Sequence, residues 1–310
     1  MESCPIPKSE FEVLSQEISE DCASYRISAG QRVYYLTMAS DTFDEDTMCR
    51  PHFLIPQLPD FPDTKWTTME VSRKSDGSLT SKLSFEALPA VKTIWQSKII
   101  DILSLKKVKR YRSGVHEVLF SGVPAICKFA CFGWQIPGIE HETYTYSVIQ
   151  EYREPGDPVI APAFLGHVME NGRVIGMLLE KLEGNFASTD DLPVCREALE
   201  NFHRMNMVHG DVNRYNFILD RSKEPVHVRL VDFEHAEPYE EWKALEELQS
   251  LSLELAETTG RGGSVAIVHS VFENETFCRS AACGPQICSL IVERVIIFIF
   301  LYYCTCNLGN

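Results

Sequence analysis

The chain has 310 residues and a formal net charge of −15, from 44 acidic and 29 basic side chains. Hydrophobic residues make up 45% and charged residues 24%, which is ordinary for a soluble globular protein and excludes a fibrous or wholly disordered chain. Binding to a phosphate backbone requires a basic surface, so nucleic acid is not expected as a partner.

Three features bear on the compartment. The opening residues, MESCPIPKSEFEVL, lack the basic and apolar regions of a signal peptide. The cysteines before residue 200 are scattered, as expected for reduced thiols. The apolar run at residues 295–304 has ten residues, whereas a membrane helix needs about 20, so a buried strand or an interfacial segment is expected there. We therefore expect a cytoplasmic protein without a membrane span.

Residues 1–104 are expected to form an acidic N-terminal extension with some ordered pieces. Four prolines between residues 51 and 62 should prevent a regular element there. Residues 66–73 and 79–85 alternate in polarity around Asp76-Gly77, which predicts a hairpin. The apolar spacing over residues 92–104 predicts a short packed helix.

Residues 105–183 are expected to form a small lobe with five strands and one helix. Asn171-Gly172 is a strong hairpin turn between the last two strands. The strands are predicted at residues 107–112, 117–121, 124–130, 164–170 and 173–182, and the helix at residues 139–150.

Residues 184–263 are expected to form a short, mainly helical lobe. Asp190 or Asp191 can cap its first helix, with Pro193 in the first turn. The predicted elements are a helix ending near Met205, a polar loop at 209–216, strands at 217–220 and 226–232, and a helix at 239–257. Residues 264–310 are a Cys-rich, apolar tail, whose irregular cysteine spacing does not favour a zinc site.

The polar loop carries the most informative motif. It reads HGDVNRYN at residues 209–216, and Asp232-Phe233-Glu234 follows an apolar strand sixteen residues later. Phosphoryl transfer needs one carboxylate beside the attacking hydroxyl, and an Asn and a second Asp to hold the magnesium that screens the phosphates. A polar turn followed by an edge strand would explain either segment alone, but the two together favour a phosphotransferase.

These two segments resemble the protein-kinase-like superfamily, and most closely its aminoglycoside phosphotransferase and choline kinase branch and uncharacterised fungal kinase-like proteins. The resemblance covers residues 105–263 and implies an α+β, two-lobed kinase-like fold, with an antiparallel-sheet lobe and a mainly helical lobe, that uses ATP and Mg²⁺. It implies Asp211 as the catalytic base, and Asn216 and Asp232 as the metal ligands.

The same resemblance assigns residues in the small lobe. Lys128 closes the third strand, where the family keeps its phosphate-pairing lysine, and Glu142 would orient it, with Glu140 as the alternative. Gly114 would contact phosphate from the first turn, where protein kinases carry three glycines and this chain has one. The backbone at Glu180 and Leu182 would bind the adenine.

At two positions the chain differs from protein kinases, and both differences bear on the expected function. Gly210 stands where protein kinases have an arginine that receives an activation-loop phosphate, and Glu234 replaces a glycine. We therefore expect transfer of the terminal phosphoryl group of ATP to a hydroxyl, on a small molecule more than on a protein. The alternatives are a pseudokinase or truncated nucleotide-binding scaffold, and a Ser/Thr protein kinase. The sequence identifies neither the acceptor nor the oligomeric state.

Overall fold

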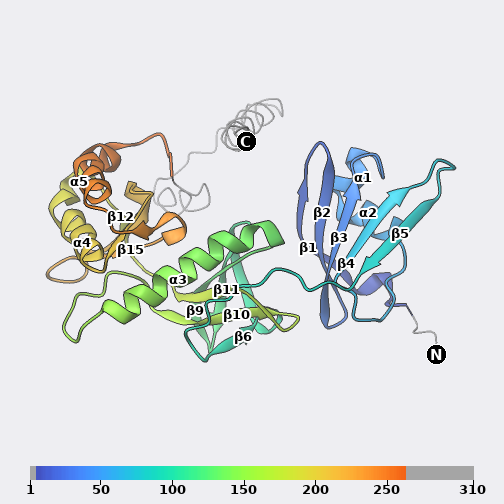
Figure 1. Cartoon of the computed structure of the whole chain (residues 1–310), viewed down its shortest axis with the longest axis horizontal. Coiled ribbons are helices and arrows are strands. Elements are labelled where there is room, and N and C mark those ends of the chain that lie inside the picture. Colours follow the sequence, from blue (N-terminus) through green and yellow to red (C-terminus); the bar gives the residue numbers. More distant parts are fainter. Residues whose placement is uncertain (1–4, 263–310) are drawn as a thin grey trace, which may run out of the picture. The chain divides into compact units, whose positions relative to one another are not determined.

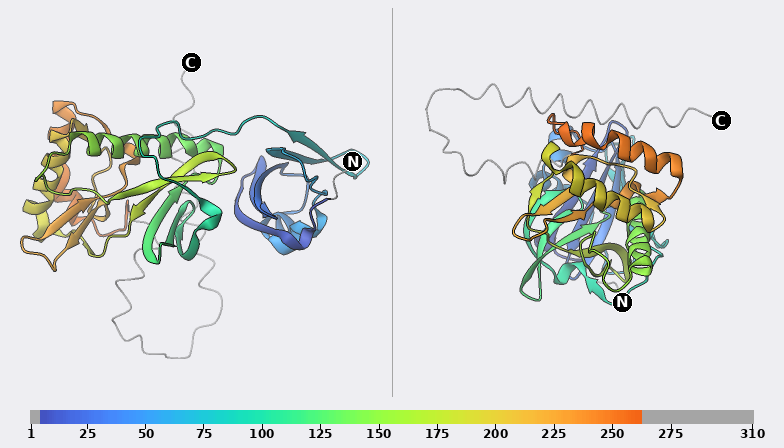
Figure 2. Two further views of the ribbon diagram at one scale, coloured as in Figure 1. Left: turned by 90° about the horizontal axis from the view of Figure 1, so that it is seen from below. Right: turned by 90° about the vertical axis from the view of Figure 1, so that its left-hand side faces the viewer.

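The computed structural model of the chain describes residues 5–262 (Figure 1). Its N-terminal part contains a five-stranded sheet of order β1-β2-β3-β4-β5, in which only the β3–β4 pair is parallel. The sheet curves strongly on itself (Figure 2) and encloses a core that includes Tyr25, Leu36, Leu54 and Trp66. The strands are β1 (Phe11–Ile18), β2 (Cys22–Ala29), β3 (Arg32–Ala39), β4 (Thr68–Arg73) and β5 (Leu79–Ser84).

The hairpin expected around Asp76-Gly77 is confirmed as β4 and β5. The expectation of no regular element between residues 51 and 62 is wrong, because helix α2 spans Pro51–Gln57, after α1 at Glu45–Cys49. Pro51 occupies the first turn of α2, where its missing N–H costs no hydrogen bond. Asp44 caps helix α1, because its side chain accepts a hydrogen bond from the Thr47 N–H at 2.9 Å.

A second sheet has six strands in the order β6-β10-β11-β9-β8-β7. Five of them match the predicted strands, and Asn171 and Gly172 form the β10–β11 turn with φ of 50° and 80°, as this hairpin type requires. The strands are β6 (Ile99–Asp101), β7 (Lys106–Arg112), β8 (Val115–Phe120), β9 (Val123–Phe129), β10 (Phe164–Glu170) and β11 (Arg173–Glu180).

The sixth strand replaces a predicted helix. The helix expected over residues 92–104 is absent, and β6 instead pairs in parallel with β10, followed by a single 3₁₀ turn, η2 (Ile102–Ser104). Ile100 and Ile102 are buried, whereas Ile99 and Leu103 are exposed. This alternation has the period of a strand, which the mixed apolar spacing of the segment also permits.

Helix α3 (Ile136–Tyr152) contains the helix predicted at residues 139–150 and lies along one face of the six-stranded sheet (Figure 1). Its buried side chains include Ile139, Tyr146 and Ile149, which join the core beneath the sheet. The helix therefore fixes the positions of its acidic residues relative to β9 and β11.

The following residues form the lobe that carries α4 (Leu192–Arg204) and α5 (Glu241–Ala256), close to the predicted helix bounds. Short strands complete it in two small sheets: β12 (Asn185–Phe186), β14 (Phe217–Asp220) and β15 (His227–Leu230), and β13 (Met207–Val208) with β16 (Glu237–Pro238). A sheet-rich lobe with one helix followed by a lobe with two helices confirms the predicted α+β, two-lobed class.

The five-stranded sheet contacts the β10–β11 hairpin through a buried acid. Glu170 is 0% exposed and accepts hydrogen bonds from Arg26 Nε at 2.7 Å and from the Tyr35 hydroxyl at 2.5 Å. The neighbouring Asn171 binds the backbone of Val33 through its side-chain amide. A buried carboxylate needs such partners, so the N-terminal sheet and this hairpin depend on each other.

No helix within residues 5–262 combines the length and the apolar character that a membrane crossing requires. The expectations for the tail, including those for the apolar run at residues 295–304 and for the cysteines after residue 277, lie outside the described residues.

Candidate active site

Lys128 lies in β9, a central strand of the six-stranded sheet, and is 7% exposed. Its ammonium group forms ion pairs with Glu142 of α3 and, at 2.5 Å, with Asp232 Oδ1. These three residues come from a strand, a helix and a turn that are up to 104 residues apart in the chain. The fold thus brings together three of the residues that the sequence singled out.

The two candidate glutamates of α3 have different partners. Glu142 is 1% exposed and faces Lys128. Glu140 instead accepts hydrogen bonds from the Thr93 N–H at 3.1 Å and from the Thr93 hydroxyl at 2.5 Å. Two residues correspond to about 200° around a helix, so α3 can present only one of the two to β9.

Asp232 stands at the turn before η6 (Phe233–His235), with φ of 67° and ψ of 63°. This left-handed conformation is uncommon for residues other than glycine, although aspartate tolerates it better than most. A second cation, Arg112 at the end of β7, lies 3.3 Å from Asp232 Oδ2. The turn therefore holds the carboxylate between two cations.

The charges of this cluster are strongly coupled. Burial alone would lower the pKa of Lys128, but Glu142 and Asp232 outweigh it and raise that pKa, so the ammonium stays charged. Burial would likewise raise the pKa of Asp232, but Lys128 and Arg112 hold it well below its ordinary value. Burial raises the pKa of Glu142, with Lys128 opposing, so Glu142 takes up a proton more readily than Asp232.

The polar loop begins at His209, which is fully buried. Its Nε2 lies 3.1 Å from the Val231 carbonyl oxygen, immediately before Asp232, and must carry the hydrogen of that bond. Burial lowers the pKa of His209, so the ring is neutral. His209 therefore links the start of the loop to the turn that carries Asp232.

Gly210 is held tightly in this loop. Its φ is +74°, and a Cβ atom there would lie 1.9 Å from the His235 carbonyl oxygen. Its N–H donates a 2.6 Å hydrogen bond to Glu247 of α5, which also pairs with His203 of α4 at 2.7 Å. The backbone conformation at position 210 thus leaves no room for a side chain, which is a steric reason why this chain has glycine where protein kinases have arginine.

Asp211 follows and receives two side-chain amides. Asn213 Nδ2 and Asn216 Nδ2 lie 3.1 and 3.2 Å from Asp211 Oδ2, and Asn216 Nδ2 also donates to the Asp211 carbonyl oxygen at 2.8 Å. Within residues 5–262, the Oδ1 atoms of Asp211 and Asn216 accept no hydrogen bond. One carboxylate oxygen and one amide oxygen are thus left for a ligand.

Gly114, in the β7–β8 turn, sits directly beside the end of β9. Its carbonyl accepts a 2.8 Å hydrogen bond from the Phe129 N–H, next to Lys128. Its φ is +72°, and a Cβ atom there would lie 2.3 Å from the Phe129 carbonyl oxygen, so only glycine fits.

The segment expected to bind adenine starts at Glu180, the last residue of β11, and continues beyond that strand. The Glu180 side chain binds Arg229 at 2.8 Å and the Ala163 N–H at 3.0 Å. The Glu180 N–H donates to the Ala163 carbonyl at 2.9 Å. The backbone N–H and C=O of Leu182 make no backbone hydrogen bond with another described residue and can serve a ligand.

Two residues of the site were not singled out by sequence. Arg112 is the last residue of β7, and its partner Asp232 lies 120 residues away. Glu247 is one of several glutamates in an acidic helix. Its position four residues before Leu251, at the spacing of the buried helix face, is the one sequence signal that sets it apart.

No protein-family model matches the chain, and no curated protein matches it. Among solved structures, the fold is similar to that of the kinase PK-1 of Cydia pomonella granulovirus, with 13% sequence identity and a TM-score of 0.36. This match covers 50% of the present chain and 71% of the viral one. A likeness of this size identifies neither a family nor a substrate.

Proposed function

We propose that the chain is an ATP-dependent phosphotransferase that transfers the terminal phosphoryl group to a hydroxyl of a small molecule. The observation that carries this proposal is the buried Lys128 ammonium between Glu142 and Asp232, beside a loop that offers Asp211 and Asn216. A structural ion pair needs one carboxylate, whereas phosphoryl transfer needs a positioned cation, a metal-binding carboxylate and a base together.

The donor set fits magnesium. An Asp232 carboxylate oxygen and the Asn216 amide oxygen are hard ligands of the kind that Mg²⁺ prefers, and the ion takes few protein ligands because it keeps waters and phosphate oxygens. Within residues 5–262, no group of three or more His, Cys, Asp or Glu side chains is placed to hold a metal ion, so a magnesium ion here would depend on Asp232, the Asn216 amide oxygen, waters and phosphate oxygens. When bound, the ion would neutralise charge on the phosphates.

The remaining roles follow from position. Lys128, kept charged and oriented by Glu142, would pair with the phosphates. Arg112, 3.3 Å from Asp232 Oδ2, adds a second cation to the cluster. Asp211, oriented by two amides, would accept the proton of the attacking hydroxyl.

A nucleotide-binding scaffold without catalysis is the second candidate. It is favoured by one observation: Lys128 and Arg112 already neutralise Asp232, an arrangement that requires no metal. A Ser/Thr protein kinase is less favoured, because the backbone at Gly210 cannot carry the arginine that would receive an activating phosphate.

The first experiment is thermal unfolding with ATP, in Mg²⁺ or in EDTA. A ligand at about 100 times its Kd stabilises the folded state by about 2.7 kcal/mol, which raises Tm by roughly 5–10 °C for a domain of this size. The shift should require Mg²⁺ and disappear in Asp232→Asn. It should persist in Asp190→Asn, which changes an exposed carboxylate elsewhere.

The second experiment separates catalysis from binding. Phosphoryl transfer to a panel of small alcohols should fall by about 10²–10⁴ in Asp211→Asn, with the thermal shift intact. A Mg²⁺-dependent shift without any transfer would favour the scaffold. No shift in any condition would refute nucleotide binding altogether.

A further inference from the structure

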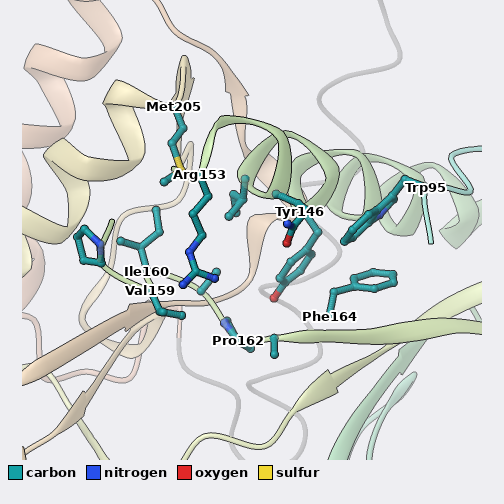
Figure 3. Close-up of a pocket in the computed structure, with 13 residues that line it drawn as sticks. Trp95, Tyr146, Arg153, Val159, Ile160, Pro162, Phe164 and Met205 are labelled. Carbon is teal, nitrogen blue, oxygen red and sulfur yellow. The ribbon is translucent and has the colours of Figure 1, made fainter. Parts of the chain in front are cut away.

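A cavity of about 150 Å³ lies between α3, residues 158–164 and the end of α4 (Figure 3). None of the residues assigned to phosphoryl transfer lines it. Three aromatic rings form much of its wall: Phe164 lies 4.5 Å from Trp95 and 5.7 Å from Tyr146 between ring centroids. Further apolar side chains, including Ile149 and Ile160, complete this wall. The cavity thus presents surfaces that suit a flat apolar group.

The Tyr146 hydroxyl is unusual in this wall. The residue is 3% exposed, and its oxygen has no hydrogen-bond partner among the described residues. Its ring extends from α3 with the hydroxyl toward Pro162 (Figure 3). Burial raises the pKa of Tyr146, so the hydroxyl keeps its proton and can donate. Buried hydroxyls are nearly always paired, so this one needs a water or a ligand atom beside it.

The charge at the cavity is positive. Arg153, which follows α3, lines it and extends its guanidinium toward residues 160–162 (Figure 3). Arg153 forms no ion pair or hydrogen bond with any other residue that the structure describes. The cavity wall contains no Asp or Glu side chain, so nothing in the wall neutralises this cation or repels an anion.

We propose that this cavity binds a small aromatic carboxylate, with its ring against Trp95, Tyr146 and Phe164 and its carboxylate facing Arg153. The size fits, because cavities of about 150 Å³ in other proteins hold a benzene ring. Guanidinium groups are also well suited to carboxylates, which they can bind through two parallel hydrogen bonds. The site needs no nucleotide, so its test is independent of the proposed phosphotransferase activity.

The test uses ¹⁹F NMR titration of the full chain with 4-fluorobenzoate, fluorobenzene and trifluoroacetate. The chain should bind 4-fluorobenzoate more tightly than either of the other two probes, because only that probe has both the ring and the charge. Arg153→Gln should weaken 4-fluorobenzoate binding at least tenfold and leave fluorobenzene binding unchanged. Arg110→Gln, which removes an exposed arginine on β7, is the matched control and should change neither.

A second variant tests the location. Ala163 is an exposed residue at the edge of the cavity, so Ala163→Trp should fill the opening without disturbing the core and should abolish binding of both aromatic probes. Circular dichroism would establish that this variant is folded. The proposal is overturned if 4-fluorobenzoate does not bind the wild type, if it binds Ala163→Trp equally well, or if trifluoroacetate binds as tightly.

Discussion

Replacing Lys128 by methionine should be among the most destabilising single changes in the small lobe. The substitution keeps most of the length of the side chain but leaves Glu142, 1% exposed, without its cation. Removing one partner of a buried ion pair costs about 3–5 kcal/mol, whereas replacing both partners by uncharged groups is close to neutral. The double variant Lys128→Met/Glu142→Gln should therefore be more stable than Lys128→Met, by about 2 kcal/mol.

The pH dependence gives an independent check. In Lys128→Met, burial raises the pKa of Glu142 above its unfolded value with no ammonium opposing it. A carboxyl with a raised folded pKa destabilises the protein above that pKa, and the penalty is relieved as the pH falls through it. The stability gap between the single and double variants should therefore shrink from pH 8 to pH 5.

The assay should report on the small lobe itself, because the five-stranded sheet has its own core. Hydrogen exchange of peptides from α3, followed by mass spectrometry, measures its local opening free energy. Lys107→Met, which removes an exposed lysine of β7, is the matched control and should change little. If the double variant exchanges as fast as Lys128→Met at pH 8, the two residues are not coupled and the argument from buried charge fails.

Two further predictions concern the polar loop. Gly210→Ala should destabilise the chain by about 3 kcal/mol or more, since its Cβ would lie 1.9 Å from the His235 carbonyl oxygen. Gly122 is the control, because it also has a positive φ but has open space around it. In thermal unfolding, Gly122→Ala should cost only about 1 kcal/mol. Burial would raise the pKa of Glu247, but its bonds from His203 and Gly210 lower it, so it stabilises the fold above pH 4.5 and less as the pH falls further. As the pH falls below 4.5, Glu247→Gln should lose less folding stability than the wild type does. An equal loss of stability in the two proteins would refute this role of Glu247.

The elements with local signals could be predicted from the sequence. The strands from β8 to β11 are short, largely apolar runs bounded by turns, and Asn171-Gly172 specifies its hairpin by backbone conformation alone. Residues 99–104 were wrongly predicted as part of a helix, because Ile99, Ile102 and Leu103 fit a helical face as well as a strand. Pairing with β10, which is distant in sequence, decides its conformation.

For the candidate site too, the local features could be predicted from the sequence and the long-range contacts could not. The spacing of Asp211 and Asn216 is local, and both lie in one loop, where the side chains meet. Which glutamate of α3 faces Lys128 depends on how the helix is rotated against the sheet, and Glu140 is drawn away by Thr93. Arg112 could not be identified for a related reason, since its position beside Asp232 depends on the arrangement of the whole lobe.

The backbone around Asp232 and Gly210 supports the proposed binding role of the site. A non-glycine residue at φ of 67° costs on the order of 1 kcal/mol, and such strain persists where the surroundings enforce it, often at functional sites. Here His209 holds the segment before Asp232, and Glu247 holds Gly210 from α5. An ion pair alone could form without either of these two hydrogen bonds. The second lobe thus supplies the contacts that fix the loop and the turn, as the proposed presentation of Asp211 and Asp232 to one ligand would require.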